Sequence, residues 1–248
     1  MDLKLNLREG CLDKDGGGHA MWRVETRQKW VRAFRTAILI CDMWDAHWSR
    51  GATERVDAMA PVMDRVIGVA RANGVHIIHA PSDTLAAYAG TPARERALAA
   101  PAVPTPEPIA HADPPLPIDD SDEGSDTGEL HPFRAWSRQH PAIRIDQERD
   151  AISDDGGEVY NLLRLWNVQQ LLIMGVHTNM CVLNRSFGIK QMVRWRVPVA
   201  LVRDLTDAMY NPARAPYVDH DAGTQLVIGY IERFWCPSIT SDDLSQGD

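Results

Sequence analysis

Short apolar segments alternate with segments of helical periodicity along most of this 248-residue chain. The apolar segments are typical of buried strands, and they lie at 36–43, 75–80, 142–145, 169–176, 197–204 and 238–241. The segments with helical spacing of apolar residues lie at 52–74, 92–100, 156–168, 181–195 and 222–234. Strands that alternate with helices predict βαβ units and a mostly parallel sheet. We therefore expect an α/β fold of three layers (αβα), with a Rossmann-like, six-stranded, mostly parallel sheet in the middle.

Two regions interrupt this pattern within what we interpret as a single domain spanning 1–248. Residues 1–33 are polar, and we expect them to form an irregular N-terminal arm over the domain. Residues 101–141 are rich in proline and contain the acidic run DDSDEGSD at 119–126. Irregular insertions of this length are usually either functional lids or disordered. We expect part of the insertion to cover the functional site as a lid.

The composition limits the classes of partner. A net charge of −8 argues against binding to nucleic acid or to an anionic membrane surface. No stretch is long and apolar enough to span a membrane, and the first ten residues lack the apolar core of a signal peptide. The cysteines contain no CxxC pair, which favours a reduced, cytoplasmic protein; they are Cys11, Cys41, Cys181 and Cys236.

The segment GVHTNMCVL (175–183) places Cys181 between an expected strand and an expected helix. A helix N-terminus lowers the pKa of a thiol, and its backbone N–H groups can bind an oxyanion. This position favours a nucleophile, although a buried structural cysteine is the more common fate of a lone cysteine.

Asp42 ends the first expected strand, where a carboxylate is costly to bury unless it is paired or used. It could cap a loop, or it could act as a general base for a thiol. Ligands bind beyond the carboxyl ends of the strands in open α/β sheets. Because the first and fourth strands are neighbours in a doubly wound sheet, we expect Asp42 and Cys181 to meet there.

The segments LICDMWDAHW (39–48) and GVHTNMCV (175–182) together resemble the isochorismatase-like cysteine hydrolases. That superfamily includes isochorismatase, nicotinamidase and N-carbamoylsarcosine amidohydrolase, and the resemblance is strongest over 36–83 and 142–204. It implies a Cys–Asp–Lys triad in which Cys181 attacks a carbonyl carbon and Asp42 takes the thiol proton. It also implies a cis peptide bond between Val176 and His177, an oxyanion hole formed by the N–H groups of Met180 and Cys181, and a homo-oligomer (dimer or tetramer).

The family lysine is missing, since the four lysines of the chain are Lys4, Lys14, Lys29 and Lys190. Placing residues 150–152 against the family's Ser-Ala-Phe puts Asp146 at the lysine position, and a slip of two or three residues puts Glu148 or Arg149 there. Arg149 would stabilise a thiolate by charge, whereas Glu148 could share a proton with Asp42. Alternatively, both side chains point to solvent.

Other residues near the expected nucleophile and base are candidates for substrate binding. Trp44, His47 and Trp48 could form a flat apolar wall for a substrate, or they could pack beneath the insertion. His177 and Asn179 could orient a substrate amide. The Asp-x-His…His metal set of nicotinamidases has no counterpart in HAPSDTLAAY (79–88), so we expect neither a metal nor another cofactor.

These features favour hydrolysis of a C–N bond in an amide, carbamoyl or imide group of a small molecule, through a thioester at Cys181. Two alternatives stay open. One is the vinyl-ether hydrolysis of isochorismatase, which does not need the cysteine. The other is a binding protein without catalytic activity, which the absent lysine favours.

Overall fold

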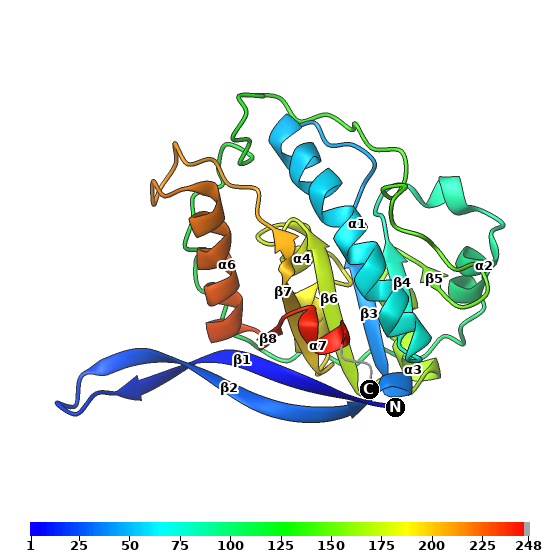
Figure 1. The fold of residues 1–248 in the computed structure, drawn as a ribbon, viewed down its shortest axis with the longest axis horizontal. Helices are drawn as coiled ribbons and strands as arrows, with labels where there is room; N and C mark the ends of the chain where they lie inside the picture. Colours follow the sequence, from blue (N-terminus) through cyan, green and yellow to red (C-terminus); the bar gives the residue numbers. More distant parts are fainter. Residues whose placement is uncertain (246–248) are drawn as a thin grey trace.

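An eight-stranded sheet runs through the protein in the computed structural model, which describes residues 1–245 (Figure 1). The strand order is β2-β1-β8-β7-β6-β3-β4-β5. The six strands from β8 to β5 pair in parallel, and they are β3 (Thr36–Cys41), β4 (His76–Ala80), β5 (Ala151–Ile152), β6 (Gln170–Val176), β7 (Val199–Asp207) and β8 (Ser238–Ile239). This arrangement confirms the expected α/β class with a mostly parallel sheet.

Helices cover both faces of the sheet, which makes the three layers. They are α1 (Arg50–Ala72), α2 (Pro92–Leu98), α3 (Gly156–Leu165), α4 (Cys181–Asn184), α5 (Ile189–Arg194), α6 (His220–Phe234) and α7 (Asp242–Ser245). Residues of α1 and α7 pack on one face of the sheet, and residues of α3, α5 and α6 pack on the other. Within residues 1–245, no helix combines the length and the apolar character that a membrane crossing requires.

The two central strands, β3 and β6, are buried along their whole length. They pair in parallel with Cys41 opposite Gly175. Gly175 has φ +111°, and a Cβ atom there would lie 2.0 Å from the carbonyl oxygen of Cys41. Glycine is therefore required for the ends of these strands to approach each other, and that approach brings the segments after them together.

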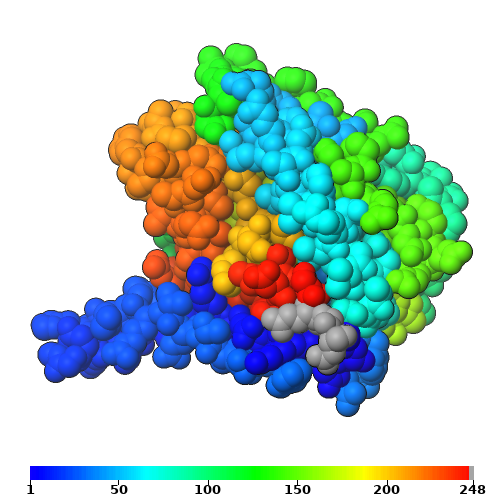
Figure 2. All heavy atoms as spheres, in the orientation of Figure 1, coloured from blue at the N-terminus to red at the C-terminus, as the bar shows by residue number. Residues whose placement is uncertain are grey.

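The N-terminal region differs from the expected irregular arm. It forms two antiparallel strands, β1 (Asp2–Lys14) and β2 (Ala20–Arg32), that extend the sheet beyond β8. Leu3, Leu5 and Leu7 alternate along β1 and are buried against the α1 face of the sheet. That alternation has the period of a half-buried strand. The distal part of the hairpin projects from the body of the molecule (Figures 1 and 2).

The strand expected at 142–145 is also wrong, because the edge strand β5 begins later, at Ala151. Ile143 is buried, but Arg144 binds Asp64 of α1 through both its backbone N–H and its guanidinium, each at 2.9 Å. This segment is therefore held against α1 and not against the edge of β4.

The insertion at 101–141 has no helix or strand and crosses the carboxyl end of the sheet (Figure 1). Its acidic run is anchored by ion pairs to other parts of the chain. Asp122 binds Arg214 at 3.0 Å, and Asp126 binds Arg55 of α1 at 2.8 Å. These contacts fix the insertion over the ends of β3, β6 and β7.

Candidate active site

Asp42 follows β3 and is completely buried, with φ 46°. Its Oδ1 accepts a hydrogen bond from the backbone N–H of Ser82 at 2.8 Å, and its Oδ2 accepts one from Nε of Arg185 at 3.0 Å. Burial raises the pKa of the Asp42 carboxyl, while Arg185 and Ser82 act in the opposite direction. A buried carboxylate with a raised pKa is a suitable proton acceptor near neutral pH.

Cys181 is the first residue of α4, and its thiol lies close enough to Asp42 for each group to shift the pKa of the other. Burial, followed by the negative charge of Asp42, raises the pKa of the Cys181 thiol to about 12. The N-terminal position in α4 therefore does not make Cys181 a low-pKa thiol. Helix α4 has only four residues, and burial of the thiol beside a carboxylate is the main cause of the raised pKa.

Arg185 is the cation that contacts Asp42. It lies four residues after Cys181, just beyond α4, and its guanidinium binds both Asp42 and, through Nη2 at 3.5 Å, Asp83. Asp42 and the Cys181 thiol raise the pKa of Arg185, and Arg185 lowers the pKa of both. Cys181, Asp42 and Arg185 thus form one charged cluster.

Neither Glu148 nor Arg149 contacts Asp42 in the structure. The expectation that one of them takes the place of the family lysine is therefore wrong. The backbone N–H of Glu148 binds Asp146, and Arg149 donates a hydrogen bond of 2.8 Å to the carbonyl oxygen of Arg71. Asp150 is buried and binds Arg71 through two hydrogen bonds. This ion pair holds residues 146–150 near the C-terminal end of α1, away from the site.

The peptide bond between Val176 and His177 is cis, as the resemblance implies. The backbone N–H of Met180 donates a hydrogen bond of 3.0 Å to the carbonyl oxygen of His177, so it is not free for an oxyanion. The backbone N–H of Cys181 has no backbone hydrogen bond to any of residues 1–245. The expected oxyanion hole of two N–H groups is therefore reduced to the N–H of Cys181.

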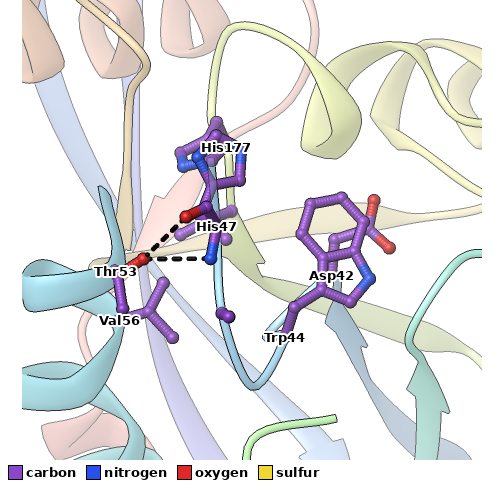
Figure 3. A pocket seen from close by; sticks show the side chains of 8 residues that line it. Asp42, Trp44, His47, Thr53, Val56 and His177 are labelled. Carbon is purple, nitrogen blue, oxygen red and sulfur yellow. Dashed lines mark hydrogen bonds between the residues drawn. The ribbon is translucent and has the colours of Figure 1, made fainter. Parts of the chain in front are cut away.

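The buried His177 and the half-buried His47 lie against each other in a small cavity that Asp42 also lines (Figure 3). Their ring centroids are 4.9 Å apart, and Nε2 of His177 has no hydrogen-bond partner among the described residues. Burial lowers the pKa of His47 to about 4 and that of His177 to about 3, so both rings are neutral at pH 7. They line a cavity of about 10 Å³, which has room for one water molecule at most.

The aromatic residues after Asp42 pack beneath the insertion, which is one of the two alternatives that the sequence leaves open. Trp44 stacks on Trp136 of the insertion at a centroid distance of 4.2 Å, and its indole N–H donates to the carbonyl oxygen of Ser82. Trp48 is buried and packs with Met209. These side chains support the loop that carries Asp42.

Asn179 ties the nucleophile turn to two other segments. Its side chain accepts a hydrogen bond from the N–H of Met209 and donates to the carbonyl oxygen of the same residue, at 2.9 and 3.0 Å. It also donates a hydrogen bond of 2.8 Å to Oδ2 of Asp120 in the insertion. Asn179 thus fixes the position of the insertion relative to Cys181.

An open cleft of about 420 Å³ leads to Cys181. Its volume lies in the range of small-molecule sites, roughly 300–1,000 Å³. The lining residues come from the insertion and from the segment after β6, and they are Leu116, Asp120, Asn179, Met180, Cys181, Asn184, Arg185 and Lys190. The insertion therefore supplies part of the wall beside Cys181, whereas His177 and the tryptophans lie outside it. Among residues 1–245, no group of three or more His, Cys, Asp or Glu side chains is placed to hold a metal ion.

Solved structures share this architecture. A cysteine hydrolase from Pseudomonas syringae pv. phaseolicola 1448A matches with a TM-score of 0.53 and 17% identity, over 87% of this chain and 92% of that chain. An isochorismatase-like hydrolase from Alkaliphilus metalliredigens matches with a TM-score of 0.50 and 14% identity, over 86% and 97%. This chain has the isochorismatase-like fold.

Neither a protein-family model nor a curated protein sequence matches the chain. The isochorismatase-like fold agrees with the resemblance carried by the Asp42 and Cys181 segments.

Proposed function

We propose that the protein is a cysteine-dependent hydrolase that cleaves the C–N bond of an amide, carbamoyl or imide group in a small molecule. One observation carries this proposal. The buried carboxylate of Asp42 contacts the guanidinium of Arg185 and lies beside the thiol of Cys181, which lines an open cleft. The shared fold with structures named as hydrolases supports the reaction class.

The first step is attack by sulfur on the carbonyl carbon. Because the pKa of the Cys181 thiol is about 12, the group is protonated at neutral pH. The proton must therefore move to Asp42 as the S–C bond forms and the carbonyl oxygen takes up the electron pair. The raised pKa of Asp42 makes this transfer less unfavourable than it would be for an ordinary carboxylate.

The intermediate then collapses to a thioester. Asp42 gives its proton to the leaving nitrogen, the C–N bond breaks, and ammonia or an amine departs. A water molecule attacks the thioester carbon while Asp42 accepts one of its protons. The C–S bond breaks, the acid product leaves, and the sulfur of Cys181 regains the proton from Asp42.

Arg185 supplies the positive charge that the family lysine would provide. An arginine keeps its proton at any physiological pH, so its role is electrostatic. It lowers the pKa of Asp42, which favours the ionised carboxylate, and it stabilises negative charge on the sulfur. Arg185 thereby removes the main reason for interpreting the chain as a binding protein without activity.

A panel of primary amides, ureas, carbamates and cyclic imides, assayed for release of ammonia or amine, tests the proposal. We expect at least one class to be hydrolysed by the wild type and not by Cys181→Ser. Full activity in Cys181→Ser would exclude the thioester. No release from any class would contradict the proposal itself.

A further inference from the structure

The charges around the cleft are not equally neutralised. Among the residues that line it, Arg185 pairs with Asp42 and Asp83, and Lys190 pairs with Asp113 at 2.9 Å. Asp120 takes part in no ion pair with the described residues. It is therefore the charge in the wall beside Cys181 that has no counter-charge.

Asp120 is also distinct within its own acidic run. Asp122 and Asp126 anchor the insertion through ion pairs with arginines. Asp120 instead accepts one hydrogen bond, from the neutral side-chain amide of Asn179 to Oδ2. Its Oδ1 has no hydrogen bond to any of residues 1–245, so one carboxylate oxygen, fixed in orientation by Asn179, is available to a ligand.

We propose that Asp120 makes the cleft selective for substrates that carry a cationic group, an ammonium or a guanidinium, near the bond that is cleaved. This inference rests on the proposed function and names its substrate class. A cation would pair with the free charge of Asp120. An anionic substrate would be repelled by Asp120. The two lining cations would not offset this repulsion, because they are already paired with other carboxylates. The binding energy of the cationic group would hold the scissile carbonyl at Cys181.

Three thiol reagents of different charge test this inference without turnover. They are the trimethylammonioethyl (cationic), methyl (neutral) and sulfonatoethyl (anionic) methanethiosulfonates. Each transfers its thioalkyl group to the sulfur of Cys181 as a mixed disulfide, methanesulfinate leaves, and the thiol proton goes to solvent. A Cys11→Ser background removes the other partly exposed thiol, since Cys41 and Cys236 are buried. Intact mass then reports the rate at Cys181.

The ratio of the cationic to the anionic rate is the quantity that reports on Asp120. Both reagents need the same thiolate, so a change in the pKa of Cys181 cancels in the ratio. We expect a ratio well above one, and we expect Asp120→Asn to lower it by about tenfold, the lower end of electrostatic steering effects. Asp119→Asn is the matched control, because it removes the same charge from the neighbouring residue, which does not line the cleft.

An unchanged ratio in Asp120→Asn, an equal fall in Asp119→Asn, or a wild-type preference for the anionic reagent would overturn the inference. Failure of all three reagents to modify Cys181 would also overturn it, because the cleft would then not lead a ligand to the sulfur. These outcomes are separate from a failure of the proposed function, which the amide panel reports through product release.

Discussion

The guanidinium of Arg185 donates a hydrogen bond of 3.0 Å from Nε to Oδ2 of Asp42, a carboxylate that is completely buried. A buried carboxylate without a cation would be protonated over much of the neutral pH range. The arginine comes from the segment directly after Cys181, so one turn of chain supplies both the nucleophile and the charge that controls its base.

Removal of the cation should reduce catalysis. Arg185→Met leaves Asp42 buried without its counter-charge, and we expect kcat/KM to fall on the order of 100-fold, as when a charge-stabilising group is lost from an active site. Arg185→Lys should retain part of the activity, because it keeps the charge but not the planar donor geometry. Steady-state kinetics on a hydrolysed amide measures both variants.

Arg149→Met and Glu148→Gln are the controls for that experiment. Neither side chain contacts Asp42, so both variants should keep the wild-type kcat/KM. A loss of activity in either one, together with an active Arg185→Met, would show that the charge comes from residues 146–150 and not from Arg185.

The reactivity of Cys181 should keep increasing with pH above the pH at which an ordinary thiol is fully ionised. Because the pKa of Cys181 is about 12, alkylation by iodoacetamide should accelerate by about tenfold per pH unit from pH 7 to pH 10 without a plateau. Intact mass in a Cys11→Ser background measures the rate. A plateau below pH 9 would show that the thiolate is already formed there.

Asp42→Asn should separate thiol reactivity from catalysis. The negative charge of Asp42 raises the pKa of Cys181, so its removal should speed alkylation at pH 8. The same substitution removes the proton acceptor and should abolish hydrolysis. A variant that is slower in both assays would indicate that Asp42 only maintains the local structure.

The acid limb of the pH profile should report on Asp42. The pKa of this carboxyl is raised in the folded protein, so the base becomes protonated, and kcat/KM falls, at a pH above the ordinary carboxyl range near 4. Arg185 lowers this pKa, and Arg185→Lys should therefore leave the midpoint nearly in place, whereas Arg185→Met should move it to higher pH. A midpoint that is the same in all three proteins would exclude Asp42 as the titrating base.

Asn179 should contribute to stability through its contacts with Met209 and Asp120. We expect Asn179→Ala to lower the free energy of unfolding by about 2–3 kcal/mol, because it leaves buried backbone groups of Met209 unpaired. Asn184→Ala removes two hydrogen bonds in a more exposed position and should cost about 1 kcal/mol. Urea denaturation compares the two variants, and an equal cost would contradict a special role for Asn179.

The sequence was sufficient to predict the parallel sheet and the meeting of Asp42 with Cys181. Both follow from unbroken apolar strands whose carboxyl ends lie side by side. The sequence does not predict the hairpin of residues 2–32. Leu3, Leu5 and Leu7 alternate with polar residues, but most of the two strands is exposed and has no further periodic pattern.

The role of Arg185 is not apparent from the sequence for a different reason. The resemblance places the cation at the end of a strand, whereas a cation at the fourth residue after the nucleophile can return to the same site. The side-chain directions in 146–150 depend on the buried ion pair between Asp150 and Arg71, a contact between residues 79 positions apart. No local pattern in the sequence encodes such a contact.

A mass spectrum of the protein quenched during turnover of an amide tests the thioester mechanism at Cys181 most directly. We expect an acyl adduct on the peptide that contains Cys181, present in the wild type, reduced in Arg185→Met and absent in Cys181→Ser. Product release without any adduct on Cys181, and at an undiminished rate in Cys181→Ser, would contradict it.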